Sequence, residues 1–193
     1  LVAQDVAQAP DSLPFRHGQW GALFRLDAAY ASAGVLRFTS PRRAWLADVR
    51  VSAAVSHGTN SSTLDGDPFP EGRTRTSGVI LQLRAGRRAY APLGRAVVTH
   101  RGAGVLTSFD RFRSRFRSGS FESTGGDWAW GAGAFGEVGA EYLVTPRFGL
   151  GAAGQVELGY TERRGSLFES GHAVERGVNL TTSLITFTAT VYF

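Results

Sequence analysis

The sequence contains no cysteine, no methionine and no lysine, and it has no long hydrophobic run. The absence of cysteine excludes a disulfide scaffold and thiolate chemistry. No apolar stretch approaches the ~20 residues that a membrane-spanning helix needs. All 21 basic residues are arginines, and the net charge is +5. Because these arginines are dispersed along the chain instead of forming one basic cluster, no nucleic-acid partner is expected.

What the sequence has in abundance is alternation of apolar with polar or small residues, which is typical of β-strands with two different faces. The pattern is clearest at 128–144, where tryptophan, alanine, valine and tyrosine alternate with glycine and glutamate. Eight segments are predicted in this way, the fifth being the least regular: 20–30, 35–39, 45–55, 79–84, 89–103, 128–144, 148–160 and 185–193.

The connections between these segments follow a rule. Tight turns are predicted at 40–43, 85–88 and 145–147, and long polar loops at 57–76, 104–126 and 162–177. Short turns at one end and long loops at the other are typical of outer-membrane barrels. The first hairpin, around 31–34, is an exception because it is short where a long loop is due. We therefore predict an all-β, eight-stranded antiparallel up-and-down transmembrane β-barrel over residues 17–193. Residues 1–16 are predicted to be an extended periplasmic lead-in left after removal of a signal peptide.

Alternation alone does not tell the inside of a barrel from the outside, since a soluble barrel turns its apolar face inward. Here the polar face carries charges of both signs, and an eight-stranded barrel has an interior that side chains can fill. Buried charges must be paired, and the partners exist in this sequence. The predicted lumen ion-pair network consists of Arg25, Asp27, Arg37, Asp48, Arg50, Arg84, Glu137, Glu141 and Glu157.

Aromatic residues on the apolar face fall at the ends of the segments, where amphipathic rings meet lipid headgroups. Trp20 and Tyr30 are ten residues apart, about 33 Å at ~3.3 Å per residue, or roughly 23 Å of height at a tilt of ~45°. This height fits the ~25 Å apolar band of a membrane barrel. The two predicted girdles contain Trp20, Tyr30, Phe38, Trp45, Tyr90, Trp128, Trp130, Tyr142, Phe148, Tyr160 and Phe193.

The final stretch, LITFTATVYF at 184–193, alternates hydrophobic residues up to Phe193. It resembles the C-terminal insertion signal of bacterial outer-membrane barrels, and the hairpins at 35–54 and 130–160 resemble those of small eight-stranded barrels of the OmpX and OmpA type. The resemblance implies location in the outer membrane of a Gram-negative bacterium. It also implies recognition of the C-terminal strand by the barrel-assembly machinery, and contact with outer-membrane lipid and lipopolysaccharide.

Evidence for catalysis in the sequence is sparse. Some eight-stranded barrels are lipid A deacylases or acyltransferases, and the stretch SHGTNSS places His57 close to Ser61 and Ser62. A histidine-activated serine is one interpretation, and a solvated loop of turn residues is the other and favoured one. No metal site or cofactor is expected, because the lumen acids are accompanied by no cysteine or lumen histidine. Those acids are interpreted as a structural plug of ion pairs, with a narrow channel as the alternative.

The segment FDRFRSRFRSGSF at 109–121 is the strongest candidate for binding. Arg111, Arg113, Arg115 and Arg117 alternate with phenylalanine and serine, so a strand would present four guanidiniums on one face. Such a face could bind lipopolysaccharide phosphates bidentately, or the hairpin could pair with a protein partner by strand addition. The remaining interpretation is a solvated hairpin whose charge protects its own edge.

Overall fold

The computed structural model describes residues 13–27, 30–60, 63–64, 67–68, 72–119, 121–167 and 171–193. This part of the chain is built of strands, and it contains no helix long and apolar enough to cross a membrane.

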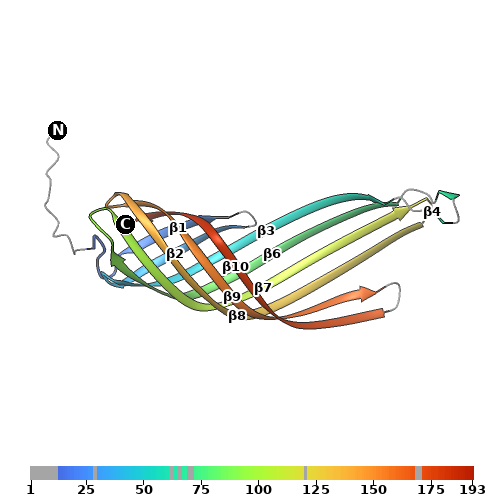
Figure 1. Ribbon diagram of the computed structural model, residues 1–193. Coiled ribbons are helices and arrows are strands. Elements are labelled where there is room, and N and C mark those ends of the chain that lie inside the picture. The colour runs from blue at the N-terminus through green and yellow to red at the C-terminus, as the bar shows by residue number, and fades with distance from the viewer. Residues whose placement is uncertain are drawn as a thin grey trace.

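Eight strands close into an antiparallel barrel in the order β1-β10-β9-β8-β7-β6-β3-β2, as the sequence predicts (Figure 1). A separate two-stranded hairpin, β4 (Thr63–Leu64) with β5 (Asp67–Pro68), lies beyond the barrel. The barrel strands are β1 (Trp20–Leu26), β2 (Ala31–Ser40), β3 (Arg43–Asn60), β6 (Gly72–Pro92), β7 (Val97–Ser118), β8 (Phe121–Thr145), β9 (Phe148–Leu167) and β10 (Gly171–Tyr192).

The predicted orientation of the two faces is confirmed. Phe187 and Leu150 expose 66% and 48% of their surface on the outside, whereas Glu137 and Arg50 expose 3% and 5% inside. A period of two therefore separates an apolar outer face from a polar lumen, which is the arrangement of a membrane barrel and the reverse of a soluble one.

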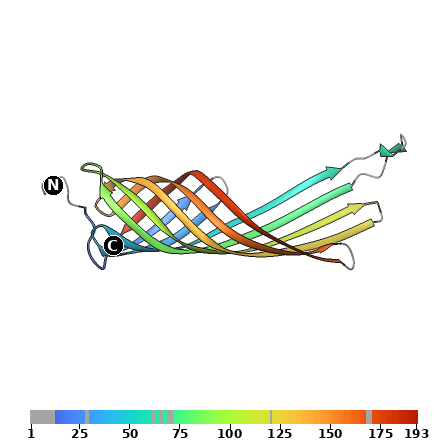
Figure 2. The same cartoon turned by 60° about the horizontal axis from the view of Figure 1, so that its bottom comes forward.

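The three predicted long loops are wrong as loops. Residues 57–60 and 72–76 continue β3 and β6, residues 104–118 and 121–126 continue β7 and β8, and 162–167 and 171–177 continue β9 and β10. These strands rise far beyond the end of β1 and β2 as a tall extension (Figures 1 and 2). Residues 104–109 are still part of the barrel wall, with Val105 exposed on its outer face. Beyond the end of β1 neither face of the strands packs in a core, so no continuous apolar face marks them in the sequence, although backbone pairing continues.

The predicted turn at 85–88 is also wrong. β6 runs through it, with Arg87 exposed and Arg88 buried on opposite faces. The turn lies at 93–96, after Pro92, which cannot donate to a strand ladder, and it contains Gly94 at a φ of 146°. The two adjacent arginines at 87–88 are therefore part of a strand that serves both the surface and the lumen.

The β1–β2 hairpin is much shorter than its neighbours. β1 has seven residues, roughly 16 Å of height at ~3.3 Å per residue and a tilt of ~45°. Its pairing with β10 stops at Leu26 opposite Phe187, and pairing of β2 with β3 stops at Ala31 opposite Val51. Among the described residues, the edge of β3 that faces β2 therefore has no strand partner beyond Val51. Likewise, the edge of β10 that faces β1 has none before Phe187.

Candidate functional site: the lumen and the outer arginine patch

Charged side chains fill the middle of the lumen as a chain of ion pairs. Asp48 and Arg84 are direct partners on β3 and β6, and two hydrogen bonds join them, Nε to Oδ1 at 2.8 Å and Nη2 to Oδ2 at 2.7 Å. Arg25 of β1 contacts Asp48 at 3.6 Å and Glu137 at 2.9 Å without hydrogen-bond alignment. Arg88 contacts the same Glu137 at 2.7 Å.

The chain continues toward the open end of the barrel. Arg50 binds Glu157 at 3.0 Å, and Gln155 accepts hydrogen bonds from Arg50 at 2.8 Å and Arg84 at 2.6 Å. Gln82 donates to Glu157 at 3.1 Å. Removing one member of such a buried network leaves its partner charged and unpaired, which is costly in a low-dielectric interior.

Glycines opposite these acids make room for them. A Cβ on Gly34 would lie 2.5 Å from the Cβ of Asp48, and one on Gly102 would lie 2.8 Å from Oε1 of Glu137. Gly34 and Asp48 are cross-strand partners, as are Gly102 and Glu137. Glycine at 34 and 102 is therefore explained by the bulk of the carboxylate side chain that faces each position.

An aromatic cluster closes the lumen at the end where the short turns lie. Phe15, from the segment before β1, stacks on Phe38 with ring centroids 4.5 Å apart, and lies 5.1 Å from Tyr90 and 4.9 Å from Tyr192. All four side chains are buried. Glu141 is anchored beside this cluster by the Tyr192 hydroxyl, which donates to it at 2.7 Å. The domain boundary at 16/17 stays a prediction, although Phe15 on its far side packs inside the barrel.

The structure brings together six of the nine predicted lumen residues as ion pairs: Arg25, Asp48, Arg50, Arg84, Glu137 and Glu157. Glu141 faces the lumen but bonds to Tyr192 and Thr190. Asp27 lies in the β1–β2 turn and accepts a hydrogen bond from the Tyr30 backbone. Arg37 is misassigned, because it lies on the outer face with its guanidinium 5.4 Å from the centre of the Trp20 ring.

Eight of the predicted girdle residues are on the outer face, seven of them exposed and Phe148 half-buried: Trp20, Trp45, Trp128, Trp130, Tyr142, Phe148, Tyr160 and Phe193. Phe38 and Tyr90 are wrong as girdle residues, because they belong to the aromatic cluster inside the lumen. Tyr30 is wrong as well, since its ring packs 5.0 Å from the guanidinium of the lumen residue Arg50. Contact of the eight with lipid headgroups stays a prediction.

Two further residues pack in the lumen although the sequence does not predict them there. Arg88 falls in a predicted turn, but it lies four residues after Arg84 on the same face of β6, and this even spacing is a signal that could have found it. Phe15 gives no comparable signal, because it lies before the first alternating segment and its contacts are all distant in sequence.

The predicted face of four guanidiniums is present and larger than expected. Arg111, Arg113, Arg115 and Arg117 are all exposed on the outer face of β7. Arg75 and Arg73 of β6 lie directly opposite Arg115 and Arg117. We call these six residues the outer arginine patch. It begins next to the aromatic ring at this end, because Arg111 is the cross-strand partner of Trp128.

A second basic group continues on the same face near Tyr160. Glu162 holds Arg164 at 2.8 Å and Arg176 at 3.1 Å by hydrogen bonds from their Nε atoms. The hydrogen bonds from Arg164, and next from Arg176, hold the pKa of Glu162 below its usual value. Arg164 also lies 5.3 Å from the centre of the Trp128 ring.

The predicted catalytic alternative is only partly inside the described ranges. His57 is exposed on β3 opposite Arg75, while Ser61 and Ser62 lie outside the described residues. Within the described residues no group of three or more histidine, aspartate or glutamate side chains is arranged to hold a metal ion.

Comparison with solved structures finds a major outer membrane protein from Thermus thermophilus. It superimposes with a TM-score of 0.60 at 12% identity, covering 91% of this chain and 98% of that chain. CarO2 from Acinetobacter baumannii gives a TM-score of 0.40 at 9% identity, over 91% and 97% of the two chains. Ail, the attachment invasion locus protein of Yersinia pestis, gives 0.33 at 9%, over 91% and 94%. No protein-family model matches the chain, and a search of curated proteins finds no match.

The apolar outer face, the aromatic residues at its two ends and the enclosed ionic interior define an integral membrane β-barrel. More particularly, the protein has the fold of bacterial outer-membrane barrels. In barrels of this fold the short turns face the periplasm, which predicts that the end with the short turns, the start of β1 and the end of β10 is periplasmic. The tall extension at the opposite end is then predicted to be extracellular (Figure 1).

Proposed function

We propose that the protein is an outer-membrane barrel whose outer arginine patch binds the phosphate groups of lipopolysaccharide. The observation that carries this proposal is the pairing of like charges across strands, Arg75 opposite Arg115 and Arg73 opposite Arg117. Like charges placed directly opposite each other destabilise a sheet. A bound anion between them would remove that penalty, and guanidinium groups bind phosphate bidentately.

The position of the patch supports the same ligand. Arg111 adjoins Trp128, so the patch begins where the aromatic ring meets the headgroup zone of the outer leaflet. One carboxylate neutralises part of it, since Glu122 contacts Arg115 at 2.8 Å. Both of these side chains are largely exposed, so the pair adds little to stability and leaves the positive potential in place.

Binding of purified hexa-acyl lipid A to the barrel in detergent tests this proposal. The variant Arg73→Gln, Arg75→Gln, Arg115→Gln, Arg117→Gln should lose at least tenfold in affinity, since each charge-assisted hydrogen bond contributes roughly 1.5–3 kcal/mol. The control variant Arg16→Gln, Arg42→Gln, Arg95→Gln, Arg147→Gln removes the same charge from the periplasmic end and should bind as the natural protein does. Equal affinity of all three proteins, or no preference for phosphorylated over dephosphorylated lipid A, would contradict the proposal.

We infer in addition that the lumen is plugged. The support is the buried chain of ion pairs from Arg88 to Arg50 and the aromatic cluster around Phe15 beneath it. An eight-stranded barrel leaves little interior space once such side chains occupy it. Planar-bilayer recordings should show no steady conductance, whereas a persistent open pore would favour the alternative of a narrow channel.

A further inference from the structure

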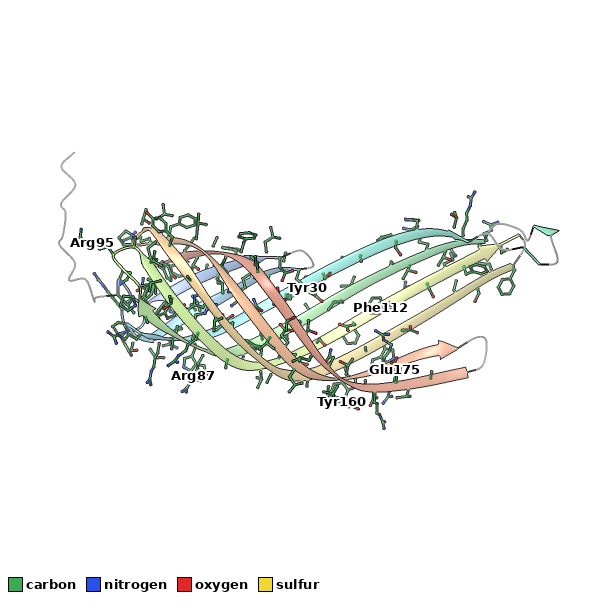
Figure 3. All side chains as sticks on the ribbon, viewed as in Figure 1. Tyr30, Arg87, Arg95, Phe112, Tyr160 and Glu175 are labelled. Atoms are coloured by element: carbon green, nitrogen blue, oxygen red, sulfur yellow. The ribbon has the colours of Figure 1, made fainter. Side chains whose placement is uncertain are left out.

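A groove on the outer surface near the periplasmic end has no part in the function proposed above. Its volume is about 580 Å³, and its lining includes Arg43 and Trp45 of β3, Arg87 and Ala89 of β6, and Arg101 and Ala103 of β7. Figure 3 shows Arg87 on the outside of the barrel, at the same end as Arg95 of a periplasmic turn.

Three cations surround the small residue Ala89 in this groove. Arg43 and Arg101 are the cross-strand partners of Ala89 on either side, and Arg87 lies two residues away on the same face. All three arginines are exposed. Among the described residues none of them forms an ion pair, in contrast to the paired arginines of the lumen.

These charges lie on the surface that faces lipid. Arg87 precedes the end of β6 at Pro92 by five residues, roughly 12 Å of height at a tilt of ~45°. An uncompensated cation at this depth on the lipid face of a barrel is destabilising. Stacking of Arg87 on Trp45, with 4.1 Å between the guanidinium carbon and the ring centre, offsets part of that cost and fixes the side chain beside the groove.

Above the arginines the outer face of the barrel wall carries small side chains, three of them alanines. Ala47, Ala85 and Val105 form one cross-strand row on β3, β6 and β7, and Ala103 lies next to Arg87. All of these side chains are exposed on the outer face, and Val49 and Leu83 continue the apolar surface beyond them. This strip of small residues, which we call the recess, therefore leads from a positively charged end at the periplasmic side into the hydrocarbon band.

We propose that this groove binds a glycerophospholipid of the periplasmic leaflet that carries a net negative headgroup. Its phosphate lies among Arg43, Arg87 and Arg101, where guanidinium groups can donate in pairs to its oxygens. One acyl chain lies along the recess formed by Ala47, Ala85 and Ala103. Charge complementarity selects the anionic headgroup, as basic pockets at membrane interfaces do elsewhere.

The test is native mass spectrometry of the detergent-solubilised barrel titrated with dioleoylphosphatidylglycerol or dioleoylphosphatidylcholine. The natural protein should retain phosphatidylglycerol at least tenfold better than phosphatidylcholine. The variant Arg87→Gln, Arg101→Gln should lose at least tenfold in phosphatidylglycerol binding, while the matched variant Arg95→Gln, Arg147→Gln should not. Heat-modifiable gel mobility confirms that each variant is folded.

A second variant separates a shaped site from general attraction by positive charge. Ala103→Leu fills the recess on the lipid side without changing the charge, and it should lower phosphatidylglycerol binding severalfold. Equal binding by the natural protein and the Arg87→Gln, Arg101→Gln variant, no preference for the anionic lipid, or unchanged binding in Ala103→Leu would each overturn the proposal. None of these results depends on the lipid A experiment, which concerns the opposite end of the barrel.

Discussion

Arg84 and Asp48 face each other on neighbouring strands and share two hydrogen bonds of 2.8 and 2.7 Å inside the barrel. Both side chains are fully enclosed, with 0% of their surface exposed. The pair links the two halves of the lumen network, because Arg25 joins Asp48 to Glu137 and Gln155 joins Arg84 to Arg50. Its energetic role is therefore to keep every neighbouring charge compensated.

Replacing one member of this pair should be strongly destabilising. Asp48→Asn leaves the Arg84 guanidinium buried without its carboxylate, which should cost about 3–5 kcal/mol. The double variant Asp48→Asn, Arg84→Gln removes both charges. Its loss in free energy of unfolding should be smaller than the sum of the losses in the two single variants. Urea unfolding in lipid vesicles, followed by tryptophan fluorescence, measures the free energy of unfolding of the natural protein and of the three variants. Additive losses would show that the two side chains do not act together.

The glycines that face the lumen acids should not tolerate a larger side chain. Gly34→Ala places a methyl group 2.5 Å from the Cβ of Asp48 and 2.6 Å from the Ala47 carbonyl oxygen, which should cost about 1–3 kcal/mol. Gly177→Ala is the control, since a Cβ there has no neighbour within 4 Å. The same unfolding assay should separate the two variants, and equal stability would mean that the lumen adapts to added volume.

The aromatic cluster should anchor the segment before β1. Phe15→Ala removes the ring that contacts Phe38, Tyr90 and Tyr192, and should destabilise the barrel by about 3 kcal/mol. Phe109→Ala, on the exposed outer face, should cost less because lipid can fill the vacated space. If Phe15→Ala unfolds at the same urea concentration as the natural protein, Phe15 does not contribute to the folded barrel.

Acid should remove one interaction on the extracellular side. Because Arg164 and Arg176 hold the pKa of Glu162 below its usual value, the stability that this carboxylate contributes is present above the pKa of the unfolded chain. It is lost as the pH falls through the lowered pKa of the folded state. The difference in urea midpoint between the natural protein and Glu162→Gln should therefore be constant from neutral pH upward and disappear in acid. A difference that grows on acidification would contradict this assignment.

The sequence predicts the barrel and the orientation of its faces well where lipid and lumen differ most. Along β3 and β8 the outer residues, such as Val49 and Val138, are apolar, and the inner ones, such as Asp48 and Glu137, are polar, so a period of two suffices. The same rule fails at Phe38 and Tyr90, because the periplasmic end of the lumen has an apolar cluster of its own. It fails at Arg37 because stacking on Trp20 stabilises a cation on the outer face.

The extension could not be predicted from a hydrophobic pattern. Its strands are held by backbone pairing between distant residues, such as Arg73 with Arg117, and neither face is buried in a core. The alternation of arginine with phenylalanine and serine at 111–118 did predict which residues share a face. It did not reveal Arg73 and Arg75, whose position opposite that face depends on strand register.

The most direct test of the account measures which medium surrounds the apolar face. The chain has no cysteine, so single cysteines can be introduced at Phe187, in the apolar band, and at Val174, in the extracellular extension, and labelled with an environment-sensitive fluorophore. In vesicles, the label at 187 should be quenched by doxyl groups on lipid acyl chains and protected from aqueous iodide, with the reverse at 174. Quenching of the label at 187 by iodide, without quenching by lipid, would contradict a barrel whose apolar side faces the membrane.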